Sequence, residues 1–172
     1  MIERAAQWIA DHAEEIARVI SDERGTPYAS CVRGLVPQVA HMMRMAIASA
    51  RTIPLQEIRR DSQGAVLVRR EPAGVVGAIV PFNGPLPIAV VKATPALLAG
   101  CPVIVKPSEV APIEVFFLAD ALAAVGLPEG MLSVVTGGEA VGRRLVEHPD
   151  VDVISFTGST AVGRSIAAAC GA

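Results

Sequence analysis

The sequence predicts an α/β fold, in which a parallel sheet with helical crossovers follows an N-terminal helical pair. Two observations support this prediction. In the first 50 residues, apolar side chains recur at intervals of three and four, which is typical of amphipathic helices. From residue 74 onward, short apolar runs alternate with helical segments four times, and such a series of β–α units implies parallel strands joined by helices.

The helical pair is predicted at residues 2–24 and 29–50. Gly25, followed by Pro27, marks the end of the first helix. Pro54 begins a polar connection, and a short strand is predicted at residues 65–69.

Four β–α units make up the rest of the chain. The predicted strands are 74–80, 102–106, 131–136 and 151–157, and the predicted helices are 86–99, 112–125, 139–147 and 160–170. The strands are continuous apolar runs, as expected where both faces of a sheet are covered. Residues 86–105 have about the length of a membrane span, but Lys92 and several prolines and glycines interrupt them, so we expect a helix, a turn and a strand rather than a membrane segment.

Composition excludes several classes of function. The 172 residues are 52% hydrophobic and 19% charged, which is too apolar for a disordered chain. The net charge is −2, no basic run exceeds two residues and aromatic residues make up only 3%, so we expect no nucleic-acid partner. Three scattered cysteines and three scattered histidines predict neither disulfides nor a metal site, and together with the absence of a secretory signal they favour the cytoplasm.

Polar and glycine residues cluster in the turns that follow the four strands. These turns are residues 81–85, 106–109, 136–138 and 157–160. Open parallel sheets bind ligands at the carboxyl ends of their strands. We therefore expect the functional site along this edge.

The last of these turns has three interpretations. Residues 158–165 nearly match a nucleoside triphosphate loop, but Arg164 stands where a lysine should reach the terminal phosphates. The turn could also be an ordinary glycine-containing connection. We favour the third interpretation, in which a cofactor pyrophosphate lies at the helix N-terminus, although the GxGxxG dinucleotide signature is absent.

Other polar residues also have two interpretations each. Lys106 and Glu109 could grip a ribose diol, or they could be solvated at a helix entrance that Ser108 caps. Asn83 could donate to a developing oxyanion, or it could only bond locally within its turn. Lys92, in an apolar helix, is expected to snorkel or to form a salt bridge.

Four segments, in this order and spacing, resemble the aldehyde dehydrogenase superfamily. They are REPAGVVGAIVPFNGP (70–85), VIVKPSE (103–109), GLPEGMLSVVTG (126–137) and HPDVDVISFTGSTAVGR (148–164). Residues 3–27 are similar to the N-terminal helical region of that family, so the resemblance covers essentially the whole chain. It implies a Rossmann-like domain for NAD or NADP, with NAD favoured because Glu109 would repel a 2′-phosphate. It also implies a catalytic domain, a small oligomerisation arm and oxidation of an aldehyde to a carboxylic acid through a Cys thioester.

The resemblance also implies roles for individual residues. Asn83 becomes the oxyanion donor, and Lys106 and Glu109 are assigned to the adenosine ribose, with Ser108 in the same turn. The remaining cofactor-binding residues are Ile79, Val80, Pro81 and Phe82 along the cofactor, Gly138 and Gly142 on the adenine side, and Phe156, Thr157, Gly158, Ser159 and Val162 at the pyrophosphate turn. Phe82 and Gly84 replace bulkier residues that are common in the family, which leaves the aldehyde open.

The implied organisation is an N-terminal helical region at 1–60, an oligomerisation arm at 61–71 and part of the cofactor domain at 72–172. The nucleophilic Cys and general-base Glu of the family match no residue here, and Cys31, Cys101 and Cys170 lie outside the nucleophile motif. We therefore expect a fragment of a homo-oligomeric enzyme, inactive by itself. The alternative is a non-catalytic nucleotide-binding or assembly module.

Overall fold

The N-terminal region is helical, as expected. In a computed structural model, which describes residues 1–171, it comprises α1 (Ile2–Asp11), α2 (Ala13–Arg24), α3 (Tyr28–Ser30), a π-helical turn η1 (Cys31–Leu35) and α4 (Val36–Arg51). The helix predicted at 2–24 is therefore two helices. The break falls at His12 (φ −100°, ψ 20°), whose ring stacks on Trp8 and whose Nδ1 lies 2.8 Å from the Trp8 carbonyl oxygen. The backbone N–H of His12 donates to the same carbonyl (3.1 Å), so both groups of His12 contact Trp8 where the two helices meet.

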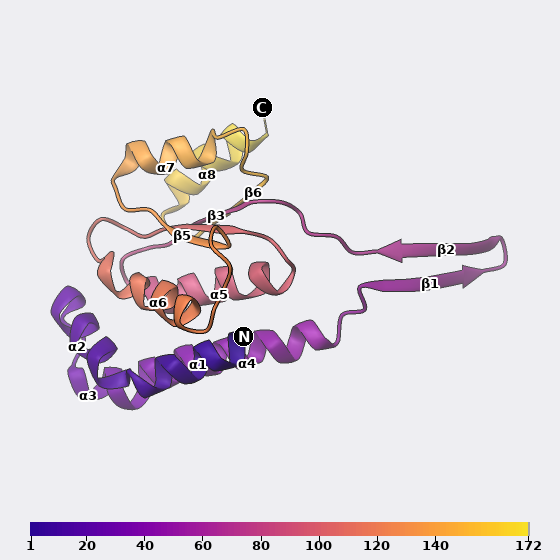
Figure 1. Cartoon of the computed structure of the whole chain (residues 1–172). Coiled ribbons are helices and arrows are strands. Elements are labelled where there is room, and N and C mark those ends of the chain that lie inside the picture. The colour runs from indigo at the N-terminus through magenta and orange to yellow at the C-terminus, as the bar shows by residue number, and fades with distance from the viewer. Residues whose placement is uncertain (172) are drawn as a thin grey trace.

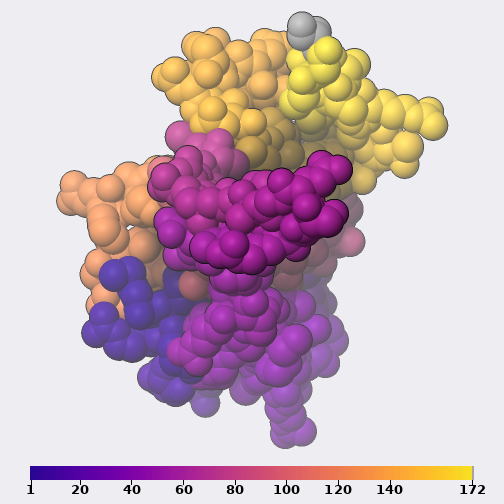
Figure 2. Space-filling view, turned by 90° about the vertical axis from the view of Figure 1, so that its right-hand side faces the viewer, coloured from indigo at the N-terminus to yellow at the C-terminus, as the bar shows by residue number. Residues whose placement is uncertain are grey.

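A β-hairpin follows α4 and extends away from the body of the chain (Figure 1). Its strands are β1 (Gln56–Asp61) and β2 (Gly64–Arg69), which pair antiparallel with Ile58 opposite Leu67. The prediction of β2 is confirmed, but the prediction of a polar connection in place of β1 was wrong. The sequence QEIRRD contains one apolar residue and no alternation, so only pairing with β2 defines it as a strand. In Figure 2 the hairpin faces the viewer and stands in front of the rest of the chain.

The predicted parallel sheet is confirmed. Its strands are β3 (Val76–Ile79), β4 (Val103–Lys106), β5 (Leu132–Val134) and β6 (Val153–Phe156), in the order β5-β4-β3-β6. After β5 the chain crosses to the far side of β3, so the strand order reverses between β3 and β6. Such a reversal is where open α/β sheets bind their ligands.

Helices cover both faces of this sheet (Figure 1). One face carries α5 (Pro85–Leu98) and α6 (Phe116–Ala124), the latter preceded by a 3-10 turn η2 (Ile113–Val115), and the other carries α7 (Glu139–Val146) and α8 (Thr160–Cys170). Helices α1 and α4 form a further layer beneath α5 and α6. The expectation of strands covered on both faces holds for β3 and β4, whereas β5 and β6 at the edges are partly exposed.

Small residues allow this close layering. A Cβ at Gly77 of β3 would lie 2.7 Å from Cδ1 of Ile154 and 3.2 Å from Cγ of Leu145, so a larger residue there would force side chains of β6 and α7 to shift. Residues 86–105 form most of α5, a turn and β4, as predicted.

Across residues 1–171, no helix combines the length and the apolar character needed to cross a bilayer.

Candidate functional site

The turns that follow β3, β4 and β6 begin side by side. Strand register places Ile79 opposite both Lys106 and Phe156, the last residues of the three strands. The Val80 amide donates to the Lys106 carbonyl (3.1 Å), and the Thr157 amide donates to the Ile79 carbonyl (3.1 Å). The edge that was expected to hold the site is therefore a continuous structure.

A groove of about 530 Å³ lies at this edge, between the strand ends and helices α7 and α8. Six of the residues predicted to bind a cofactor line it, namely Ile79, Lys106, Gly138, Gly142, Phe156 and Val162. The sequence interpretation missed the helical residues that complete the lining, which are Glu139, Arg143, Val146, Glu147, Ala161, Ser165, Ile166 and Ala169. Their spacing of three and four along α7 and α8 was the available signal.

The Gly158 turn forms a second, more open hollow of about 500 Å³, lined by Phe156, Thr157, Gly158, Ser159, Thr160, Gly163, Arg164 and Ala167. Phe156 belongs to both linings. A Cβ at Gly158 would lie 2.5 Å from the Phe156 ring, so glycine is needed at this position. The Ser159 hydroxyl accepts from the Val162 amide (3.4 Å) and caps α8, whose N-terminus therefore opens at this hollow.

Glu109 lies beside Gly138, and Lys106 lies beside Gly142. Lys106 is buried, and its Nζ donates to the Pro107 carbonyl (3.2 Å), so the alternative of a solvated lysine was wrong. Burial lowers the pKa of Lys106, and the nearby Glu109 charge raises it. A Cβ on Gly138 would lie 2.5 Å from Oε2 of the exposed Glu109. The Ser108 hydroxyl accepts from the Val110 amide (3.3 Å) in a local turn and does not cap a helix.

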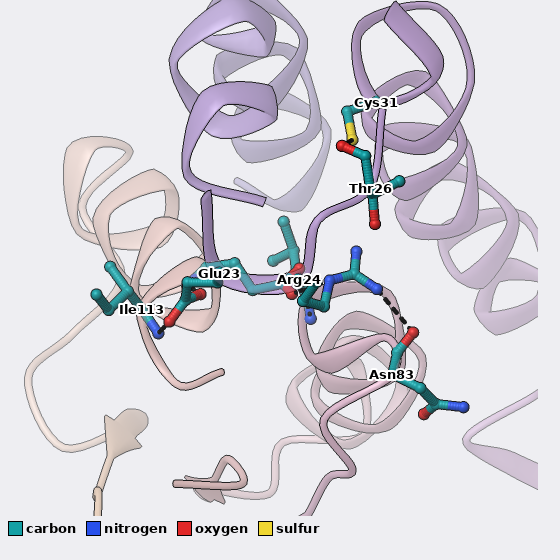
Figure 3. Close-up of polar contacts among 8 residues, drawn as sticks. Glu23, Arg24, Thr26, Cys31, Asn83 and Ile113 are labelled. Atoms are coloured by element: carbon teal, nitrogen blue, oxygen red, sulfur yellow. Dashed lines mark hydrogen bonds and ion pairs between the residues drawn. The ribbon is translucent and has the colours of Figure 1, made fainter. Parts of the chain in front are cut away.

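The turn after β3 leads away from this groove. Val80 is in the core and Pro81 is half-buried, whereas Phe82 and Asn83 are exposed. Phe82 and Asn83 line a pocket of about 370 Å³ together with Glu23, Arg24, Thr26, Val110 and Ala111. Figure 3 shows the side-chain amide of Asn83 directed away from Arg24.

A buried ion pair that the sequence interpretation missed lies beside the Asn83 turn. Nε of Arg24, at the end of α2, lies 2.7 Å from Oε1 of the fully buried Glu114. Burial raises the pKa of Glu114 to about 7, although the Arg24 charge and a hydrogen bond from the Leu86 amide act to lower it. A carboxylate inside the apolar run APIEVFF was the available signal, because a buried Glu requires a partner.

Comparison with known proteins identifies the family. The sequence pattern described as "Aldehyde dehydrogenase family" matches residues 1–172. The chain belongs to the aldehyde dehydrogenase family. It is 39% identical over 170 residues to geranial dehydrogenase of Castellaniella defragrans, covering 98% of this chain and 36% of the relative. It is 40% identical over 169 residues to 3,6-anhydro-alpha-L-galactose dehydrogenase of Streptomyces coelicolor, covering 98% of this chain and 34% of the relative.

Solved structures agree with this assignment. An aldehyde dehydrogenase of Mycobacterium tuberculosis, complexed with NAD+, superposes with a TM-score of 0.94 at 39% identity and covers 99% of this chain and 35% of its own. An NAD-dependent aldehyde dehydrogenase of Sinorhizobium meliloti superposes with a TM-score of 0.93 at 34% identity, covering 99% of this chain and 34% of its own. The chain thus spans about a third of the length of these aldehyde dehydrogenases.

For a member of the aldehyde dehydrogenase family, the cysteines are of particular interest. Cys31 and Cys101 are buried, and Cys170 is exposed on α8. Burial raises the pKa of the Cys31 thiol, which disfavours the reactive thiolate. Lys92, which was expected to snorkel or to form a salt bridge, is half-buried, and its Nζ donates to the Ser155 hydroxyl (2.8 Å).

Proposed function

We propose that this chain is the cofactor-binding part of an NAD(P)-dependent aldehyde dehydrogenase. The observation that carries the proposal is the groove at the carboxyl ends of β3, β4 and β6, at the reversal of strand order, in a chain of this family. The groove fits a dinucleotide because its glycines leave open space beside Lys106. A Cβ at Gly142 would lie 3.8 Å from Cδ and Cε of Lys106.

Different residues of the chain would bind different parts of the cofactor. Lys106 and Glu109 hold the adenosine ribose, with the ammonium donating and the carboxylate accepting. Gly138 and Gly142 lie on the adenine side, and the Gly158 turn and the N-terminus of α8 face the pyrophosphate. The bound nicotinamide supplies a hydride acceptor. Glu109 favours NAD over NADP because its charge repels a 2′-phosphate.

Asn83 is proposed as the donor that stabilises the oxyanion formed from an aldehyde carbonyl. Its side-chain amide is exposed at the 370 Å³ pocket, on a turn continuous with β3. Cys31 and Cys101 are buried, and none of the three cysteines lies in the nucleophile motif of the family, so we expect this chain to bind cofactor without oxidising an aldehyde by itself. The alternative is a nucleotide-binding or assembly module without catalysis, which the same cofactor groove would serve.

The remaining assignments concern organisation. We propose that the chain is organised as a helical region (1–60), an oligomerisation arm (61–71) and a cofactor portion (72–172) of a cytoplasmic homo-oligomer. The hairpin supports an arm, because β1 and β2 expose Ile58, Val66 and Leu67. Its first strand begins at Gln56, before the boundary expected from the sequence.

Calorimetry tests the cofactor assignment. Lys106→Met keeps the aliphatic stem and removes the ammonium, so NAD binding should weaken about 10- to 100-fold, the equivalent of about 1.5–3 kcal/mol for a charged hydrogen bond. Lys92→Met is the matched control, because Lys92 is also partly buried but does not line the groove. Equal NAD affinity in both variants and the unmodified chain would contradict the assignment. Saturable binding of magnesium–ATP in place of NAD would favour the triphosphate interpretation.

The expected lack of turnover is tested by mixing the purified chain with NAD and propanal and following NADH absorbance. No increase above the chain-free rate is expected. A rate proportional to chain concentration would show that these 172 residues are catalytically complete.

A further inference from the structure

The turn that carries Asn83 is anchored by a residue from the N-terminal helical region. Nη1 of Arg24 donates to the Asn83 backbone carbonyl at 2.7 Å (Figure 3). Among residues 1–171 this is the only hydrogen bond recorded for Asn83. Arg24 lies 59 positions earlier in the chain, so a different layer of the molecule fixes this carbonyl.

Glu114 holds the other end of the same segment. Its Oε2 accepts from the Leu86 amide (3.4 Å) in the first turn of α5, and its Oε1 lies 2.7 Å from Nε of Arg24. Arg24 and Glu114 together therefore contact both ends of residues 83–86. The side chains of Arg24 and Glu114 are 11% and 0% exposed, so their mutual contact is shielded from solvent, whereas the bond to the Asn83 carbonyl lies at the surface.

The carboxylate of Glu23 fixes the backbone of residues 113 and 114, and so the position of Glu114 relative to Arg24. Oε1 of Glu23 accepts from the Ile113 amide (2.8 Å) and Oε2 accepts from the Glu114 amide (2.9 Å). Consecutive residues at the end of α2 thus contact the backbone and the side chain of Glu114. Figure 3 shows Glu23 directed to Ile113 and Arg24 directed to Asn83.

A gain in folding stability does not explain why Arg24 and Glu114 form a buried ion pair. Among the described residues, Nε and Nη2 of Arg24 and Oε1 of Glu114 are buried without an aligned hydrogen-bond partner, although Nε and Oε1 are close. Apolar residues in place of a buried ion pair often leave a protein equally or more stable. A contribution to geometry is the better explanation, since the one aligned bond of the guanidinium is to Asn83.

We propose that Arg24 and Glu114 are positioning residues, which fix the peptide of Asn83 and thereby the direction of its side-chain amide. The catalytic meaning of this position rests on the proposed function of Asn83. The mechanical claim does not, because the order of the turn can be measured without cofactor or substrate.

The test is the backbone order parameter of the Gly84 amide, which shares a peptide unit with the Asn83 carbonyl, measured by 15N relaxation on the full chain. We expect a value of about 0.85 in the unmodified chain and below about 0.6 in Arg24→Met. Arg44→Met is the matched control, because Arg44 makes an exposed ion pair with Glu3 on the helical layer. The Gly84 value should be unchanged in this control.

A pair that only stabilises the fold would lower the melting temperature of Arg24→Met and leave Gly84 ordered, and that result would overturn the proposal. If Arg24→Met does not fold, Arg24→Lys decides. Lysine keeps the charge but lacks the forked guanidinium that contacts Glu114 and Asn83 together, so the Gly84 order parameter should still fall. A value like that of the unmodified chain in Arg24→Lys would reject the proposal.

NAD calorimetry on the same samples separates this inference from the proposed function. Loss of order at Gly84 in a chain that never binds NAD supports the positioning role and contradicts the cofactor assignment. An ordered Gly84 in an Arg24→Met variant that binds NAD contradicts the positioning role and supports the cofactor assignment.

Discussion

Glu114 shows how far burial can alter the chemistry of one residue. It is fully buried beside Arg24, yet its pKa is raised to about 7, because the loss of hydration outweighs the nearby guanidinium. Glu23 and Arg24 on α2 and the Leu86 amide on α5 are the charged and polar groups that act on it, and Cys31 is close enough for the Glu114 charge to affect its thiol. The carboxyl of Glu114 thus changes its charge within a pH range where exposed glutamates are already ionised.

This pKa predicts a pH dependence of stability. A folded-state pKa above the ordinary 4.5 means that the folded chain binds more protons than the unfolded chain between these values. The contribution of Glu114 is therefore complete below pH 4.5 and is lost as pH rises to about 7, with an upper bound of about 3 kcal/mol. Urea unfolding of the unmodified chain and Glu114→Gln, from pH 4.5 to pH 8, measures it. The difference between the two stabilities should change over this range, and a constant difference would contradict the prediction.

The sequence predicted which residues lie together where they end neighbouring parallel strands, but it did not predict contacts between other elements. Ile79, Lys106 and Phe156 could be placed together because each ends a predicted parallel strand. The Arg24–Glu114 contact could not be predicted, because 90 residues separate the two and the packing of α2 against η2 has no sequence signature. The apolar surroundings of Glu114 indicated only that some partner exists.

At the scale of elements, apolar pattern decided what could be predicted. The four β–α units were predicted because their strands are apolar runs and their helices begin and end at glycine or proline. Strand β1 was missed because its residues are polar, and pairing with β2 alone extends them. The break between α1 and α2 was missed because the apolar spacing continues through His12, whereas the ring of His12 acts locally on the Trp8 carbonyl.

Helix α7 allows stability and binding to be separated. Gly142 lies in its interior, where alanine is preferred by roughly 0.5–1 kcal/mol, and the added Cβ makes only ordinary contact with Lys106. Gly142→Ala should therefore raise the melting temperature by about 2–4 °C or less, and it should weaken NAD binding because the methyl group occupies the groove. Gly34→Ala in η1 is the control, since it meets no atom within 4 Å and lies outside the groove lining. Calorimetry and thermal unfolding check both, and unchanged NAD affinity in Gly142→Ala would contradict the groove assignment.

For the whole molecule, the layers explain how distant segments serve one site. Helices α1 and α4 pack beneath α5 and α6, so the end of α2 reaches the turn between β3 and α5. Helices α7 and α8 cover the opposite face and line the groove of about 530 Å³. The Asn83 turn and the groove thus meet at β3, but each is completed by helices from a different face of the sheet.

No layer of the molecule covers the hairpin among the described residues. A two-stranded sheet is marginally stable in isolation, yet β1 and β2 extend from the body with Ile58 and Leu67 paired on one face and exposed by 61% and 57%. Exposed apolar strands with free edges are typical of surfaces that pair with another chain.

We therefore expect the chain to self-associate through this hairpin. The double variant Ile58→Lys with Leu67→Lys should shift the sedimentation coefficient to that of a smaller species. Met45→Lys is the matched control, because it places the same charge at an exposed apolar position on α4, away from the hairpin. Identical sedimentation of the unmodified chain and the double variant at every concentration would contradict the expectation, because the hairpin would then be stable in water without a partner.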